Sequence, residues 1–433
     1  MLKKLKNIIN DTDIKEILNK GFSFLIFRLG GVLAGYFFTY FIARHYGASV
    51  NGLVSLSFSL FLFISIFGCF GIDTNLVRFF SDKVNLENNQ GIFYRVLVKS
   101  TLLSCVLAFT LYLSRNFFAE FLFNKPQLEP YIKWIALTIP FWVITLICGG
   151  MLRAKRQNSW FAFLNNPGRF LFSLLAIVCL SFYFSDPIIS IKSHFYGVFF
   201  LAILSLIVAT RNLDKITFKT SESSWIFLKE SFPMMLSSTI LVLLGWLDTF
   251  MLGIYESDDV IGVYNVALKI AALTVFSLQA INSILAPKLA ESYAINDEVN
   301  FKKIINFSAK INLVLTVFTV LTIIVFHRFL LGIFGEEFLS GSVVLLIFCF
   351  GQLLNALSGS VGVILQMTGN QKKYQNIVLI ALFLNLVLNF ILTPIYGAIG
   401  AATATVISIS SWNIMGAVYL KRKLNITSYF TIN

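Results

Sequence analysis

The sequence predicts an all-α membrane protein, a bundle of twelve transmembrane helices in two six-helix lobes. Of its 433 residues, 57% are hydrophobic and only 13% are charged, whereas soluble domains carry about 25% charged residues. Apolar runs of about 20 residues recur along the chain, which is the length that a helix needs to cross a hydrocarbon core of about 30 Å. Runs such as 311–326 lack the alternation of a β-barrel strand, so the spans are helices.

The apolar runs follow one another along the chain with short polar loops between them. We expect helices at residues 21–43, 53–77, 96–115, 131–151, 160–184, 194–210, 232–254, 263–286, 305–326, 341–366, 374–394 and 398–420. The first run is too long for a cleaved signal peptide and lacks a convincing cleavage site. The predicted organisation is a cytoplasmic N-terminal segment, an N-terminal lobe, a cytoplasmic linker, a C-terminal lobe and a cytoplasmic tail, at residues 1–20, 21–210, 211–231, 232–420 and 421–433.

The distribution of basic residues fixes the expected orientation. Of the 34 lysines and arginines, 25 lie at ends that twelve spans place in the cytoplasm, six at the opposite ends and three inside spans. Cytoplasmic loops hold the excess of Lys and Arg in membrane proteins. Adding or removing one helix would move every later loop to the opposite side of the membrane. The alternation of basic and less basic loops along the chain therefore supports twelve spans with both termini cytoplasmic. It also explains the net charge of +13 without nucleic acid, because anionic lipid is expected on that side.

The two lobes share spaced motifs, which indicates an internal repeat. Tyr46-Gly47 followed by Gly52 resembles Tyr255 followed by Gly262, and Tyr196-Gly197 resembles Tyr396-Gly397. Six helices in each copy give both copies the same orientation, hence a parallel repeat. Such repeats are typical of transporters, with the substrate between the halves.

Signatures of enzyme chemistry are missing from the sequence. It contains no HExxH, GxxxxGK[ST] or GxSxG motif, and its five cysteines form no CxxC pair. The three histidines, His45, His194 and His327, lie far apart at outer ends of spans. We therefore predict no enzyme, no cofactor and no metal site, and any uphill transport would need an ion gradient or a partner protein.

Three basic residues lie inside spans, where a charge costs about 2.5 kcal/mol or more at the helix centre. Arg28 shares a small, polar helix face with glycines, although snorkelling to the interface would also explain it. Arg169 follows Pro167 in the fifth span, and Lys269 lies in a polar stripe of the eighth. We predict that these three residues bind substrate.

Acidic residues inside spans are the second set of candidates. Asp73 and Arg78 are predicted to bind substrate, although Asp73 could also simply pair with Arg78 or sit at the helix end. Asp248 lies deeper in its span than Asp73. It could couple transport to an ion, or it could form a structural ion pair with Lys269. Asn385 and Asn389 share one face of the eleventh span, which is more typical of interhelical hydrogen bonds than of ligands.

A set of spaced motifs recurs along nearly the whole chain, at Gly71–Arg78, Asp248–Gly253, Gly262–Lys269, Leu365–Lys372 with Asn385 and Asn389, Pro394–Gly397 and Gly400–Thr405. Their order and spacing together are specific. Taken together, they resemble the motifs of bacterial O-antigen and capsule repeat-unit flippases of the multidrug/oligosaccharidyl-lipid/polysaccharide exporter superfamily.

The resemblance implies two six-helix lobes facing across a central cavity in the bacterial inner membrane. It implies export of an undecaprenyl-diphosphate-linked oligosaccharide from the cytoplasmic to the periplasmic leaflet, with membrane lipids as partners and other polysaccharide-assembly proteins as an open option. Related lipid II flippases usually have fourteen spans, so the twelve spans predicted here favour a repeat-unit flippase over a lipid II flippase. The alternatives are a multidrug exporter of the same superfamily, which would favour acidic cavity residues, and a membrane-embedded glycan polymerase or acyltransferase.

Overall fold

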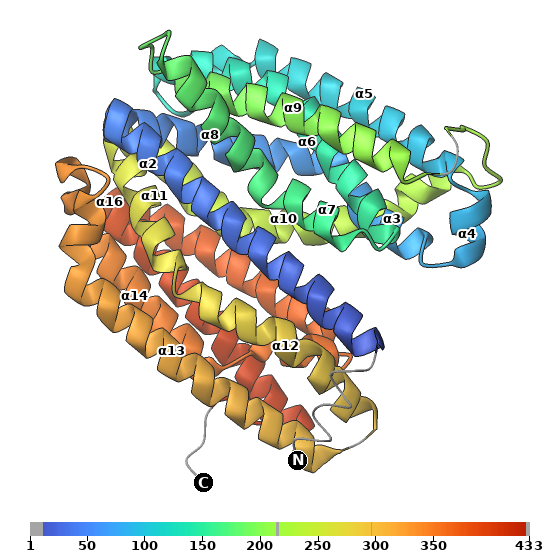
Figure 1. Ribbon diagram of the computed structural model, residues 1–433. Helices are drawn as coiled ribbons and strands as arrows, with labels where there is room; N and C mark the ends of the chain where they lie inside the picture. Colours follow the sequence, from blue (N-terminus) through green and yellow to red (C-terminus); the bar gives the residue numbers. More distant parts are fainter. Residues whose placement is uncertain (1–11, 214–215, 296, 430–433) are drawn as a thin grey trace. The chain divides into compact units, whose positions relative to one another are not determined.

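The computed structural model describes residues 12–213, 216–295 and 297–429, and most of this chain is helical (Figure 1). The helices in chain order are α2 (Thr12–Cys69), α3 (Ile72–Phe79), α4 (Lys83–Asn88), α5 (Gly91–Leu113), α6 (Glu129–Ala154), α7 (Asn158–Asn165), α8 (Pro167–Ser181), α9 (Ile189–Arg211), α10 (Ser224–Tyr255), α11 (Asp258–Ala272), α12 (Val275–Ala294), α13 (Glu298–Gly332), α14 (Ser342–Ser358), α15 (Val361–Met367) and α16 (Gln371–Leu424). Short non-α helical segments lie at Phe117–Leu122, Pro126–Leu128 and Glu336–Gly341.

The helices account for the twelve expected spans. Among the described residues, eight helical stretches are long and apolar enough to cross a membrane, and the bent pair α7–α8 adds a ninth. The stretch containing α2 and the helix α16 each hold two expected spans, because a non-helical glycine divides them at Gly47 and Gly397. The remaining span is α11–α12, which breaks at Leu273 and Thr274. The all-helical fold class is confirmed.

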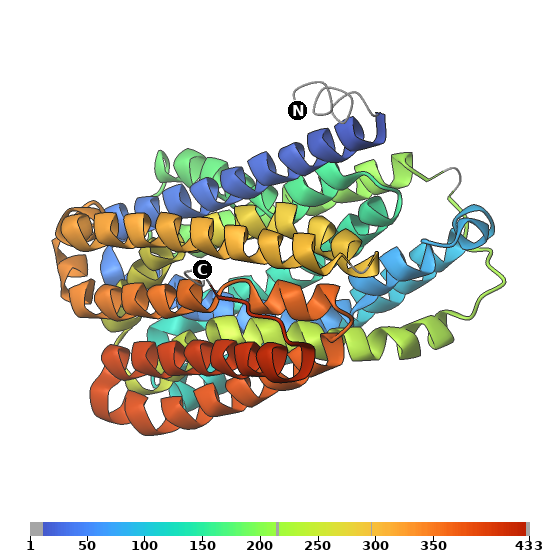
Figure 2. The same ribbon diagram turned by 90° about the horizontal axis from the view of Figure 1, so that it is seen from below.

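Two compact units make up the chain: residues 1–41 with 57–239, and residues 42–56 with 240–433. In the first unit, α9 packs against α6 and α8, and α6 also packs against α3 and α5 (Figure 1). In the second unit, α14 packs against α11, α13 and α16, while α12 packs against α13 and α15 (Figure 2). Both α2 and α10 contribute residues to each unit.

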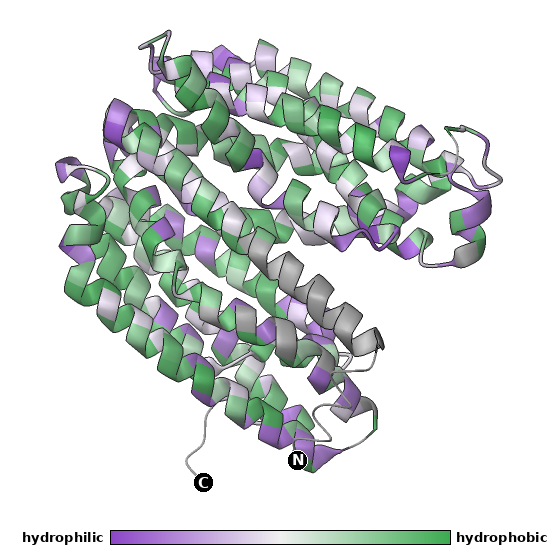
Figure 3. Ribbon diagram, viewed as in Figure 1, coloured by the Kyte–Doolittle hydropathy of each residue, from purple (hydrophilic) through white to green (hydrophobic). Residues whose placement is uncertain are grey.

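Apolar side chains remain exposed along the helices, as contact with lipid requires. Figure 3 shows hydrophobic residues along the lengths of the helices in both units. Phe121, Phe318 and Val325 are among the large apolar residues with more than two thirds of their surface exposed. Contiguous apolar surface of this kind is rare on soluble monomers.

Two glycines allow α2 and α11 to touch backbone to backbone in the second unit. A Cβ on Gly262 would lie 2.0 Å from the carbonyl oxygen of Ala48, and a Cβ on Gly52 would lie 1.8 Å from that of Asp258. The Asn51 side-chain amide donates to the Gly262 carbonyl over 3.0 Å. Gly52 and Gly262, which the sequence pattern pairs, are thus both positions where an added Cβ would clash with the facing backbone.

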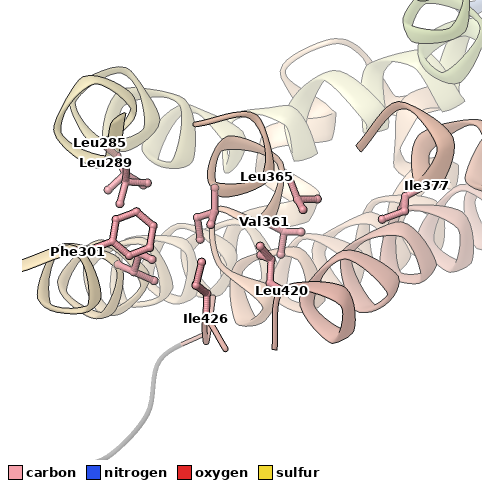
Figure 4. Packing of buried hydrophobic residues seen from close by; sticks show 10 residues of the cluster. Leu285, Leu289, Phe301, Val361, Leu365, Ile377, Leu420 and Ile426 are labelled. Carbon is pink, nitrogen blue, oxygen red and sulfur yellow. The ribbon is translucent and has the colours of Figure 1, made fainter. Parts of the chain in front are cut away.

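The segment that follows α16 packs back onto the second unit. Ile426 joins a buried apolar cluster from α12, α13, α15 and α16, whose members include Leu289, Phe301 and Leu420 (Figure 4). A Cβ on Gly359, whose φ is +74°, would lie 2.0 Å from the carbonyl oxygen of Ser428. We expected one continuous helix over residues 341–366, and this is wrong. The helix breaks at Gly359, where Ser428 lies against the backbone, so α14 and α15 are separate helices.

Candidate functional site

A buried carboxylate in the second unit accepts hydrogen bonds from side chains of two other helices. Asp248 of α10 is 6% exposed, and its Oδ2 accepts from the Tyr264 hydroxyl of α11 over 2.6 Å. Its Oδ1 accepts from the Asn389 amide of α16 over 2.9 Å. The Thr405 hydroxyl, also from α16, donates to Oδ2. We call Asp248, Tyr264, Asn389, Thr405 and Asn385 the Asp248 site.

The reversal of α16 at Gly397 places Asn389 and Thr405 on facing helix segments. Gly397 has a φ of +56°, a conformation that glycine adopts without steric cost. Close packing follows, since a Cβ on Gly400 would lie 2.1 Å from the carbonyl oxygen of Leu392. The Asn385 amide can then donate to the Thr405 hydroxyl over 3.0 Å. The interhelical hydrogen bonds expected of Asn385 and Asn389 are confirmed.

The Asp248 site has more acceptors than donors. The three groups bonded to the carboxylate are neutral, and no salt bridge to Asp248 occurs within the described residues. In addition, the buried Oδ1 of Asn385 has no hydrogen-bond partner. A carboxylate in the bilayer is costly unless a cation compensates it. The arrangement can therefore take up a proton or a small cation.

Lys269 does not supply that cation. It lies in the last turn of α11 and is half-buried, but none of the bonds to Asp248 comes from it. The structural pair between Asp248 and Lys269 that the sequence left open is therefore wrong. Whether Lys269 contacts substrate stays a prediction.

Arg169 lies in the first unit, enclosed by aromatic rings. Its guanidinium carbon is 4.4 Å from the ring centre of Phe170, 5.1 Å from Phe58, and 5.5 Å from both Phe61 and Trp142. Only 7% of Arg169 is exposed, and its Nε has no hydrogen-bond partner. We call Phe58, Phe61, Trp142 and Phe170 the aromatic cage.

Asp73 and Arg78 lie on the short helix α3 but do not pair. Arg78 forms a salt bridge with Glu230 of α10, and its Nε donates to the Asn75 side chain over 2.9 Å. Asp73 instead accepts from the thiol of Cys69 and the hydroxyl of Thr74, each over 3.4 Å. The pairing of Asp73 with Arg78 is therefore wrong, since Glu230 lies beside Arg78. Substrate binding by these two residues stays a prediction.

Arg28 belongs to α2, but its side chain lies outside the described residues. Its predicted contact with substrate is therefore untested. The sequence prediction missed Tyr264, Thr405 and His194 as members of buried polar groups. Tyr264 and Thr405 occur in the motifs behind the family resemblance, which was the available signal. His194 carried none, because its position near a span end suggested an interfacial residue.

Comparison with known proteins gives the family. Residues 18–293 match the family described as "Polysaccharide biosynthesis protein", and residues 233–391 match the MatE family. The chain is 29% identical over 216 residues to the "Probable low-salt glycan biosynthesis flippase Agl15" of Haloferax volcanii, a match that covers 50% of this chain and 45% of that protein. It is 28% identical over 150 residues to the "Capsular polysaccharide biosynthesis protein CapF" of Staphylococcus aureus, covering 34% of this chain and 38% of that protein. The chain thus spans less than half the length of these relatives.

Solved structures show the same fold. The inward closed conformation of the lipid II flippase MurJ has a TM-score of 0.74 at 17% identity, covering 95% of this chain and 88% of that one. The MATE multidrug transporter DinF-BH has a TM-score of 0.66 at 16% identity, covering 95% and 96%. These likenesses establish the architecture, while the match over 18–293 covers more than half of the sequence. The chain belongs to the family described as "Polysaccharide biosynthesis protein".

Proposed function

We propose that this protein is a flippase, not an enzyme, that moves an undecaprenyl-diphosphate-linked oligosaccharide from the cytoplasmic to the periplasmic leaflet of a bacterial inner membrane by alternating access. The observation that carries the proposal is the family match over residues 18–293, together with a relative whose name describes a glycan flippase. A polar glycan needs such a protein because unsatisfied hydroxyl groups are costly to bury in hydrocarbon. Arginine suits a diphosphate because its guanidinium makes paired contacts with phosphate oxygens.

We further propose that an ion gradient drives transport through the Asp248 site. The support is a buried carboxylate bonded to neutral donors, beside the unpartnered Asn385 Oδ1. An ion can bias a transporter only if it binds one conformational state better than the other. Asp248, Asn389 and Thr405 belong to three separate helical segments, so movement of one segment would change how many ligands the ion finds.

The leaflet position of the lipid-linked oligosaccharide tests the main proposal. Cells depleted of the protein should accumulate the unit in the cytoplasmic leaflet, and re-expression should return it to the outer leaflet. A polymerase or acyltransferase would instead leave single units in the outer leaflet, so that result would contradict a flippase. Loss of surface glycan alone does not separate these activities.

A multidrug exporter is the second candidate, favoured by the match of residues 233–391 to the MatE family. Such an exporter would bind amphipathic cations, which the buried Arg169 does not favour. Uptake of a cationic dye into inverted vesicles distinguishes the two. Gradient-driven dye uptake without glycan translocation would support the exporter.

A further inference from the structure

The first unit holds a buried polar pair, and the contact of Arg169 with substrate that the sequence suggests stays a prediction. Arg169 of α8 is 7% exposed and His194 of α9 is fully buried. The Nε of Arg169 and both ring nitrogens of His194 lack hydrogen-bond partners. Within the described residues, no carboxylate forms a salt bridge with Arg169. Three polar nitrogens are therefore buried without a hydrogen-bond partner: the Nε–H donor of Arg169, and one donor and one acceptor nitrogen of a neutral His194.

The two side chains border the same aromatic rings. Phe58 is centred 5.1 Å from the guanidinium carbon of Arg169 and 4.6 Å from the His194 ring centre. Phe61 is centred 5.5 Å and 5.2 Å from the same two groups. Arg169 and His194 thus reach one shared region from two neighbouring helices.

Close packing of α8 and α9 holds this arrangement. A Cβ on Gly197 would lie 2.5 Å from the backbone nitrogen of Ser173, so a larger residue would force the helices apart. The Ser173 hydroxyl donates to the Arg169 carbonyl over 2.6 Å. Gly197 lies about one helical turn from His194, and Ser173 about one turn from Arg169. The contact between Gly197 and Ser173 therefore positions the His194 and Arg169 side chains relative to each other.

The aromatic cage compensates only part of the cost of the buried charge. Each cation–π contact stabilises the guanidinium, but a ring face accepts no conventional hydrogen bond from it. A buried donor that makes no hydrogen bond is destabilising, and more so when it is charged. The region therefore has surplus donors and positive charge, which is the reverse of the Asp248 site.

We propose that Arg169 and His194 form a binding site for a compact inorganic anion of the halide class inside the first unit. Arg169 also lies in the first turn of the fifteen-residue helix α8, where the helix dipole favours an anion. A halide suits this site because a single spherical anion needs few donors, and the Nε–H of Arg169 and one N–H of His194 are available. The site is separate from Asp248 and does not depend on the identity of the transported substrate.

Bromide tests the proposal because it quenches tryptophan fluorescence and Trp142 belongs to the aromatic cage. The full-length protein in detergent is titrated with potassium bromide against potassium gluconate at constant ionic strength. We expect a saturable quenching component in the unsubstituted protein that disappears in Trp142→Phe. Quenching that is linear in bromide, or equal in the two proteins, would overturn the proposal without requiring any change at Arg169.

Thermal unfolding supplies the second readout. Saturating bromide should raise the Tm by about 2–4 °C over gluconate, since a ligand that binds only the folded state stabilises it. Arg169→Leu should remove this shift. Arg153→Leu is the matched control, because Arg153 is exposed and lies 5.0 Å from the Phe161 ring centre, and it should keep the shift. A bromide shift that persists in Arg169→Leu would assign the effect to another site.

Discussion

The side-chain amide of Asn389 donates a hydrogen bond of 2.9 Å to Oδ1 of Asp248 and so joins α16 to α10 within the second unit. The same amide lies 3.1 Å from the Asn385 carbonyl, and the Thr393 hydroxyl donates to the Asn389 Oδ1 over 2.9 Å. Asn389 is thereby oriented with its donor toward the carboxylate. Ion binding at Asp248 would alter this bond first, which makes the pair the place to test coupling.

Asp248→Asn should abolish the response of transport to a sodium or proton gradient. The amide cannot be ionised, and its NH₂ group would face donors, at a cost of about 1–3 kcal/mol of stability. Translocation of a lipid-linked oligosaccharide by proteoliposomes is measured with and without each gradient. The matched control is Asp259→Asn, an exposed carboxylate at the start of α11, which should behave as the unsubstituted protein does.

The double variant Asp248→Asn with Lys269→Gln gives the sharper result. A coupling role predicts that this protein folds but ignores the gradient. Gradient-driven translocation by the double variant would refute the coupling role of Asp248.

Thr405→Val should destabilise the protein by about 1–3 kcal/mol, because it removes a donor to Asp248 and an acceptor for the Asn385 amide at once. Thr405→Ser should restore most of the loss. Thr403→Val is the control, since Thr403 is only half-buried and its hydroxyl bonds only to the Ile399 carbonyl of its own helix. Thermal unfolding in detergent compares the three. Equal losses for Thr405→Val and Thr403→Val would mean that the bond to Asp248 adds no stability.

Gly262→Ala should cost about 1–3 kcal/mol, as overpacking of close contacts does, because its Cβ would lie 2.0 Å from the Ala48 carbonyl oxygen. Gly245→Ala is the matched control: it also lies within a helix, but no atom comes within 4 Å of its added Cβ. That change should be neutral or stabilise the helix by about 0.5–1 kcal/mol. Tm values of the two variants decide the point, and similar values would contradict the close contact between α2 and α11.

Arg28→Ala should abolish glycan export while the protein still inserts at normal levels. The reason is the predicted contact between its guanidinium and the substrate diphosphate, so Arg28→Lys should restore export only in part. Arg44→Ala, at an exposed arginine of the same helix, is the control and should export normally. Surface glycan and membrane abundance are measured together. Full export by Arg28→Ala at normal abundance would leave snorkelling as the explanation of this charge.

The number and order of the spans could be predicted from the sequence because the bilayer imposes a simple rule. Each segment must be apolar for about 20 residues and must satisfy its own backbone, so helices are the outcome. The sharp breaks at Gly47 and Gly397 followed from the same reading, since the apolar runs end around these glycines. The motifs also indicated the family, which the match over residues 18–293 confirms.

The partners of each buried polar group were decided by tertiary structure alone. Asp248 meets Asn389 and Thr405 across 141 and 157 positions, and helical periodicity does not say which face of which helix will be its neighbour. The reversal at Gly397 and the resulting hydrogen bonds excluded Lys269 as the partner that depth alone suggested. His194 likewise became part of a buried pair only because α9 packs closely on α8 at Gly197. Local apolar composition determines which segments form membrane-spanning helices. The polar contacts inside the protein depend instead on how those helices are rotated and packed against one another.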